Sequence, residues 1–87
     1  MDNKIKFVEW QVARGLSKGG NLSFISTVCK LMETDDTVFY LLDVKGVAEF
    51  KERFIQSNNY KLKKRKYQAA LKCAITTYQK YLDHQNF

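Results

Sequence analysis

The 87-residue sequence contains no proline and only four glycines. Chains built from many tight turns use both residues often, so this composition favours helices. No apolar run approaches the roughly 18 residues of a membrane-spanning helix, which excludes a transmembrane segment. Apolar residues make up 45% of the chain and charged residues 28%, which is typical of one small globular domain spanning residues 1–87.

The sequence also has few of the residues that carry enzyme and metal chemistry. It contains two cysteines, Cys29 and Cys73, and one histidine, His84. Two cysteines are too few for a disulfide scaffold, so we expect two reduced thiols in a cytosolic protein. Three Cys/His side chains without CxxC or HxxxH spacing do not supply the four ligands of a structural zinc site. No nucleophile–base arrangement surrounds His84, so we expect no enzyme activity, no cofactor and no small-molecule substrate.

Apolar spacing predicts four main helices and one short helical turn. The expected main helices span about residues 3–14, 18–33, 44–56 and 63–84, and the short turn spans 38–42. The run 38–42 is also compatible with a buried strand, but a single strand has no partner in this chain. Asp35 or Asp36 is expected to cap the short turn, and Asp43 the helix that follows. We therefore expect an all-α fold packed as one bundle.

The first and last helices carry the clearest apolar stripes. In the first, Ile5, Val8 and Val12 recur at i, i+3 and i+7, and Phe7 and Trp10 widen the stripe, which is expected to face the core. In the last, the stripe runs from Tyr67 to Leu82 at helical spacing. Most aromatic side chains fall on such faces, so they are expected to form the core rather than a base-stacking surface.

The connection between the first two helices is rich in glycine. Gly15 is expected to end the first helix. The second helix has two possible starts. With Ser17 as the N-cap, Gly19 and Gly20 lie in its first turn, whereas with Asn21 as the N-cap both glycines stay in the loop. Because glycine costs about 1 kcal/mol in a helix interior, Asn21 is the favoured cap.

Positive charge is concentrated in the last third of the chain. Residues 1–52 carry seven basic and eight acidic side chains, a net charge of −1, whereas residues 53–87 carry eight basic and one acidic, a net of +7. Five cations occur in residues 61–66, at the expected start of the last helix, where the helix dipole disfavours them. Positive charge concentrated in one part of a protein attracts polyanions. A bound anion would explain why cations stand at a helix start that disfavours them.

The predicted binding residues form two groups. The first would neutralise phosphates and comprises Lys61, Lys63, Lys64, Arg65 and Lys66, with Lys18 adding a contact from the loop. The second forms a ridge opposite the apolar stripe of the last helix, nearest a DNA groove, and comprises Arg65, Lys72, Thr76, Gln79 and Lys80. A basic amphipathic helix can also bind anionic lipid or a partner protein, but the apolar stripe is committed to the core, so no membrane partner is expected.

Several segments occur in a fixed order along the chain. They are Phe7-Val-Glu-Trp10-Gln, Gly15-Leu-Ser17, Asp43 to Phe54, Tyr67-Gln-Ala-Ala-Leu-Lys72 and Tyr78-Gln-Lys-Tyr81-Leu82. Over about residues 5–83 this order resembles the N-terminal core-binding, SAM-like domain of tyrosine recombinases, the phage integrases. Gly20 stands where that family has a threonine.

The resemblance implies a SAM-like orthogonal bundle of four to five helices that clamps one face of duplex DNA during recombination and integration. The family's catalytic Arg…His-x-x-Arg…Tyr set belongs to a separate domain, and this sequence does not contain it. The expected function is therefore non-catalytic duplex-DNA binding in the cytoplasm, at the nucleoid. The chain would be either the N-terminal domain of a longer protein, with a catalytic domain in the same parent chain, or a free-standing relative. The alternative is a protein–protein interaction module that docks an acidic partner or a neighbouring nuclease or catalytic domain.

Overall fold

The computed structural model describes residues 3–15 and 20–85 of the chain. Its helices are α1 (Asn3–Ala13), α2 (Gly20–Leu31), α3 (Asp36–Leu41), α4 (Val44–Gln56), α5 (Asn58–Lys61) and α6 (Arg65–Gln85). Neither of these two ranges contains a strand. The predicted all-α bundle is confirmed, and the short helical turn is α3. The one-turn helix α5 lies where the sequence predicted only a break.

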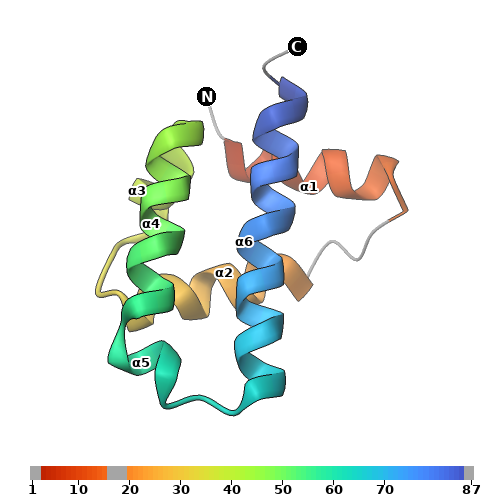
Figure 1. Ribbon diagram of the computed structural model, residues 1–87. Helices are drawn as coiled ribbons and strands as arrows, with labels where there is room; N and C mark the ends of the chain where they lie inside the picture. The colour runs from red at the N-terminus through yellow and green to blue at the C-terminus, as the bar shows by residue number, and fades with distance from the viewer. Residues whose placement is uncertain (1–2, 16–19, 86–87) are drawn as a thin grey trace.

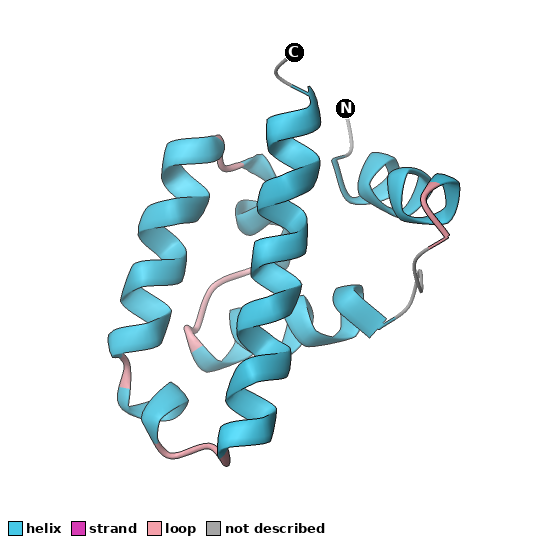
Figure 2. Ribbon diagram, turned by 45° about the vertical axis from the view of Figure 1, so that its right-hand side comes forward, coloured by secondary structure: helices cyan, strands magenta, loops and turns pink. Residues whose placement is uncertain are grey.

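The helix α6 organises the packing. Figure 1 shows α4 and α6 running antiparallel beside one another, while α1 and α2 cross α6 at a steep angle. Figure 2 shows the same crossing from a view turned by 45°. The helix α6 has 21 residues, and its first turn lies at the end of the molecule from which α5 leads into it (Figure 1).

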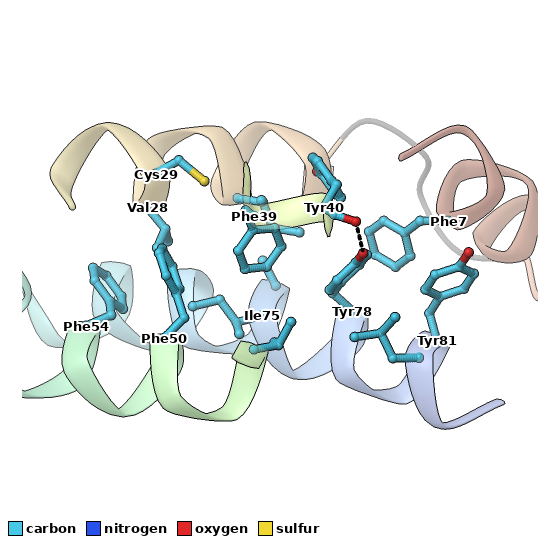
Figure 3. Close-up of a cluster of buried hydrophobic side chains, with 14 of the residues drawn as sticks. Phe7, Val28, Cys29, Phe39, Tyr40, Phe50, Phe54, Ile75, Tyr78 and Tyr81 are labelled. Carbon is cyan, nitrogen blue, oxygen red and sulfur yellow. Dashed lines mark hydrogen bonds between the residues drawn. The ribbon is translucent and has the colours of Figure 1, made fainter. Parts of the chain in front are cut away.

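An aromatic cluster around Tyr78 fills the core between these helices (Figure 3). The ring centroids of Phe7 and Phe39 each lie 5.0 Å from that of Tyr78, and the Tyr40 centroid lies 5.3 Å away. Such ring pairs contribute about 0.5–1.5 kcal/mol beyond the area they bury. The Tyr78 hydroxyl donates to the backbone oxygen of Tyr40 at 3.5 Å, and burial raises the pKa of Tyr78.

Three of the helices begin with side-chain caps. Asp35 caps α3 by accepting from the Thr37 backbone N–H at 2.8 Å, and this hydrogen bond lowers the pKa of Asp35. Asp43 caps α4 by accepting from the Gly46 backbone N–H at 2.7 Å. Both caps are confirmed predictions. Ser57 caps α5, which explains why a polar break folds into a helical turn.

The prediction for the buried face of α1 is confirmed for Phe7 and wrong for Ile5 and Val12. Ile5 and Val12 are 58% and 55% exposed, and Val8 is half-buried. Phe7 and Gln11, one turn apart, are the side chains that α1 buries. The predicted stripe is centred on the aliphatic residues, whereas the buried face is centred on the large Phe7 ring, which packs against α6.

The buried Gln11 side chain contacts the start of α2. Its buried side-chain oxygen accepts a hydrogen bond from the Asn21 side-chain nitrogen at 2.7 Å. The helix begins at Gly20, so Asn21 lies inside it, and the prediction that Asn21 is the N-cap is wrong. The alternative cap, Ser17, lies outside the described residues. Gly15 follows the end of α1 with a positive φ of 74°, which confirms its predicted role.

Both cysteines are free thiols, as predicted. Cys29 is buried in the core, and burial raises its pKa to about 12. Cys73 is exposed on α6.

Candidate nucleic-acid interface

The cationic segment, residues 61–66, connects α5 to α6 and supplies the first residues of α6. It lies at the lower end of the molecule in Figure 1. Lys61, Lys64, Arg65 and Lys66 are exposed, and Lys63 is half-buried. The local fold therefore gathers the predicted phosphate-binding residues into one continuous loop and helix start.

The charges of this segment have no carboxylate partner within the described ranges. The ion pair seen among the described residues lies elsewhere, between α1 and α3, where it joins Lys4 to Asp36 at 3.8 Å. Lys63 instead holds its ammonium nitrogen 5.8 Å from the centre of the Tyr67 ring, in a cation–π contact. The positive field of the segment is thus not neutralised by neighbouring acids.

The start of α6 has an unusual residue at its N-cap position. The backbone oxygen of Lys64 accepts a hydrogen bond from the Gln68 N–H at 2.9 Å, and Arg65 is the first helical residue. A lysine side chain has donors and no acceptor, so it cannot cap the free N–H groups of the first turn. The partial positive charge of the helix start therefore adds to the lysine and arginine charges, and both favour an anion.

The structure divides the predicted ridge on α6. Lys72 and Lys80 are exposed, whereas Thr76 and Gln79 are half-buried beside α4. The Lys51 ammonium group of α4 donates to the Thr76 hydroxyl oxygen at 2.9 Å and to the Gln79 side-chain oxygen at 3.2 Å. Thr76 and Gln79 therefore already have intramolecular partners.

Lys51 is a candidate residue that sequence reasoning missed. It lies in the part of the sequence with a net negative charge, and only the pairing of α4 with α6 brings it to the ridge. A helical wheel of α6 contains only the residues of α6, so it cannot show that Lys51 of α4 joins the ridge. The remaining predicted residue, Lys18, lies outside the described residues.

Tyr67 occupies a different environment from the one predicted. The sequence placed it in the core, but it is 37% exposed, so that prediction is wrong. Its ring packs edge-on against Phe24 of α2, with the centroids 6.2 Å apart and the planes at 67°. Tyr67 lies in the first turn of α6, at the end of the bundle, where Phe24 covers only part of its ring.

A surface hollow of about 310 Å³ opens beside the cationic segment, and we call it the Tyr67 hollow. Its lining consists of Phe24, Lys64, Lys66, Tyr67 and Ala70. Three of these side chains are apolar or aromatic, two are lysines, and none is acidic. The volume is at the lower end of the range for small-molecule sites.

The described residues, 3–15 and 20–85, also bear on metal binding and on membrane insertion. No group of three or more His, Cys, Asp and Glu side chains there is placed to hold a metal ion. His84 lies exposed near the end of α6, with its ring centre 6.4 Å from that of Trp10. No helix in the same ranges combines the length and apolar character needed to cross a membrane.

No known protein family, characterised protein or solved structure shows significant similarity to this chain. The resemblance to the core-binding domain of tyrosine recombinases therefore stays a prediction, carried by the sequence segments alone.

Proposed function

We propose that this chain binds duplex DNA through the cationic segment and the exposed cations of α6, without cutting or joining the DNA. The observation that carries the proposal is the set of exposed cations in residues 61–66, which have no carboxylate partner in the described part of the chain. They surround a helix start that no side chain among the described residues caps, so phosphate groups would satisfy both the charges and the free N–H groups.

The spacing of cations along α6 suits a phosphate backbone. Arg65, Lys72 and Lys80 are exposed and lie seven and eight residues apart, which corresponds to about 10–12 Å along the helix axis. That distance equals the rise of roughly three base pairs of duplex DNA. Contacts of this kind position a protein on DNA, and sequence is read by separate contacts to base edges. Arg65 and Lys72 remain available for such contacts, whereas Thr76 and Gln79 would first have to release Lys51.

A second candidate function is docking on an acidic protein or on a neighbouring nuclease or catalytic domain. Leu62, within the cationic segment, is 83% exposed. Phosphate binding makes no use of an exposed leucine, whereas a protein interface with an apolar centre and a charged rim would. Leu62→Ser separates the two functions, because it should leave duplex binding unchanged and weaken only a protein interface.

The test of the DNA proposal is the salt dependence of binding to a labelled duplex of about 20 base pairs, measured by fluorescence anisotropy. Each neutralised phosphate contributes about −0.9 to the slope of log K against log salt. The double variant Lys64→Gln/Arg65→Gln should therefore flatten the slope by about 1.8. The matched control, Lys6→Gln/Lys45→Gln, removes two exposed cations from α1 and α4 and should leave the slope nearly unchanged. Equal effects of the two double variants would contradict the proposed site.

A further inference from the structure

The Tyr67 hollow has a lining that duplex phosphates would leave unused. Tyr67 and Phe24 present aromatic rings, and Ala70 contributes only a methyl group, which leaves space beside the rings. A hydrophobic core would normally cover a tyrosine that lies on the apolar stripe of its helix, yet 37% of Tyr67 remains exposed. The hollow therefore offers a partly open aromatic surface directly beside unpaired lysines.

The chemistry of the lining selects a ligand that is both flat and anionic. The apolar side chains favour a flat aromatic group, and Lys64 and Lys66 favour negative charge next to it. Lys63 adds a third ammonium group, 5.8 Å from the Tyr67 ring centre. No acidic side chain lines the hollow to repel an anion. An unpaired nucleotide joins a flat base to a phosphate on either side and meets both requirements.

We propose that the Tyr67 hollow binds an unpaired base of a single-stranded nucleic acid, while Lys64 and Lys66 hold the phosphates on either side of that base. The proposal rests on the proposed function, because it takes the polyanion to be nucleic acid. Base stacking on an aromatic side chain tolerates any sequence, since every base has a flat face. The protein would thus prefer DNA that is opened, frayed or single-stranded at the point of contact over a closed duplex alone.

The direct test compares two strands that differ only in their bases. A labelled oligo-dT of about 12 nucleotides and the same strand with abasic sites carry the same phosphates, so only base contacts distinguish them. The full chain should bind the strand with bases about tenfold more tightly. Tyr67→Ala should abolish this difference, and Tyr67→Phe, which keeps the ring, should preserve it. An oligo-U arm distinguishes RNA from DNA as the source of the base.

A matched pair of variants tests the hollow without removing an aromatic ring. Ala70 lines the hollow, whereas Ala69 is exposed on α6 and does not line it. Ala70→Leu should fill the hollow and abolish the preference for the strand with bases, while Ala69→Leu should leave the preference intact. Thermal unfolding of both variants shows that any loss of binding does not come from loss of the fold.

Three results would overturn the proposal. The first is equal binding of the oligo-dT and the abasic strand. The second is equal behaviour of the Ala69→Leu and Ala70→Leu variants. The third is displacement of oligo-dT by poly-glutamate as effectively as by unlabelled oligo-dT. If salt-dependent duplex binding persists in any of these cases, only the base-binding inference fails. If poly-glutamate binds and no nucleic acid does, the proposed DNA function fails as well.

Discussion

Replacing Lys64 by serine should stabilise the fold while it weakens duplex binding. Lys64 occupies the N-cap position of α6, because its backbone oxygen accepts the hydrogen bond from the Gln68 N–H at 2.9 Å. A serine hydroxyl at this position can accept a hydrogen bond from the N–H of Lys66 or Tyr67, which a lysine side chain cannot. Lys64 is exposed and forms no ion pair with the described residues, so its removal breaks no such contact.

The expected gain follows from the size of a single cap. A serine N-cap stabilises a helix by about 1 kcal/mol relative to alanine. Removing a cation from the positive end of the helix dipole adds about 0.3 kcal/mol or more. For a domain of this length, 1 kcal/mol raises Tm by about 4–8 °C. Lys64→Ser should therefore raise the free energy of unfolding by about 1 kcal/mol, and Lys64→Ala by clearly less.

Urea unfolding, followed by circular dichroism and by the fluorescence of Trp10, measures both variants. The control is the same pair of substitutions at Lys72, an exposed position in the middle of α6. At Lys72 serine should be less stable than alanine by about 0.5 kcal/mol, so the order of the two variants reverses between the positions. If serine is no better than alanine at position 64, the assignment of an uncapped helix start is refuted. If stability rises and duplex affinity does not fall, Lys64 does not serve an anionic ligand.

Four further predictions test other parts of the structure. Glu33 has a positive φ of 54°, a backbone conformation that glycine adopts with less strain than glutamate. Glu33→Gly should therefore raise the free energy of unfolding, measured in urea, by about 0.5–1 kcal/mol. An unchanged urea midpoint would show that the backbone at Glu33 is not strained. Phe7→Ala should lower stability by about 3–5 kcal/mol, whereas Ile5→Ala should change it by less than about 0.5 kcal/mol, which tests the buried face of α1. At about pH 8 a thiol reagent should modify Cys73 in the folded protein and Cys29 only after unfolding. Because burial raises the pKa of Cys29 from 9.0 to about 12, the stability contributed by its neutral thiol is complete below pH 9 and is lost between pH 9 and 12. Cys29→Ala should reduce that alkaline loss in urea unfolding.

The features predicted correctly from the sequence are those decided by a few neighbouring residues. The caps Asp35 and Asp43 each bond to a backbone N–H two or three residues away, so their roles follow from short segments. Gly15 is similar, because a positive φ after a helix depends on the local chain alone. The predicted end of a main helix at residue 56 matches the end of α4 at Gln56, although the Ser57 hydroxyl that follows also caps a further helical turn.

The features predicted wrongly depend on partners that are distant in the sequence. The side chain of Asn21 is used by Gln11 of another helix, which removes it from the capping role that propensity favoured. The exposure of Tyr67 depends on how much of its ring Phe24 of α2 covers, which a helical wheel of α6 does not contain. Lys51 reaches the ridge only because α4 packs beside α6. In each case the partner, rather than the residue's own propensity, decides the outcome.

The cationic segment and its surroundings depart from what stability favours in several independent ways. Lys64 occupies a position that prefers a capping acceptor, Leu62 is 83% exposed, and Tyr67 leaves part of its ring open. A sequence under pressure for stability alone tends to remove such conflicts one by one, since each is corrected by a single substitution. These departures lie within six residues of one another, which favours a shared cause. A bound polyanion with flat aromatic groups would account both for the positive charge and for the exposed part of the Tyr67 ring. Leu62 is the residue that this ligand does not explain, so its substitution is the sharpest way to separate a nucleic-acid surface from a protein interface at the same place.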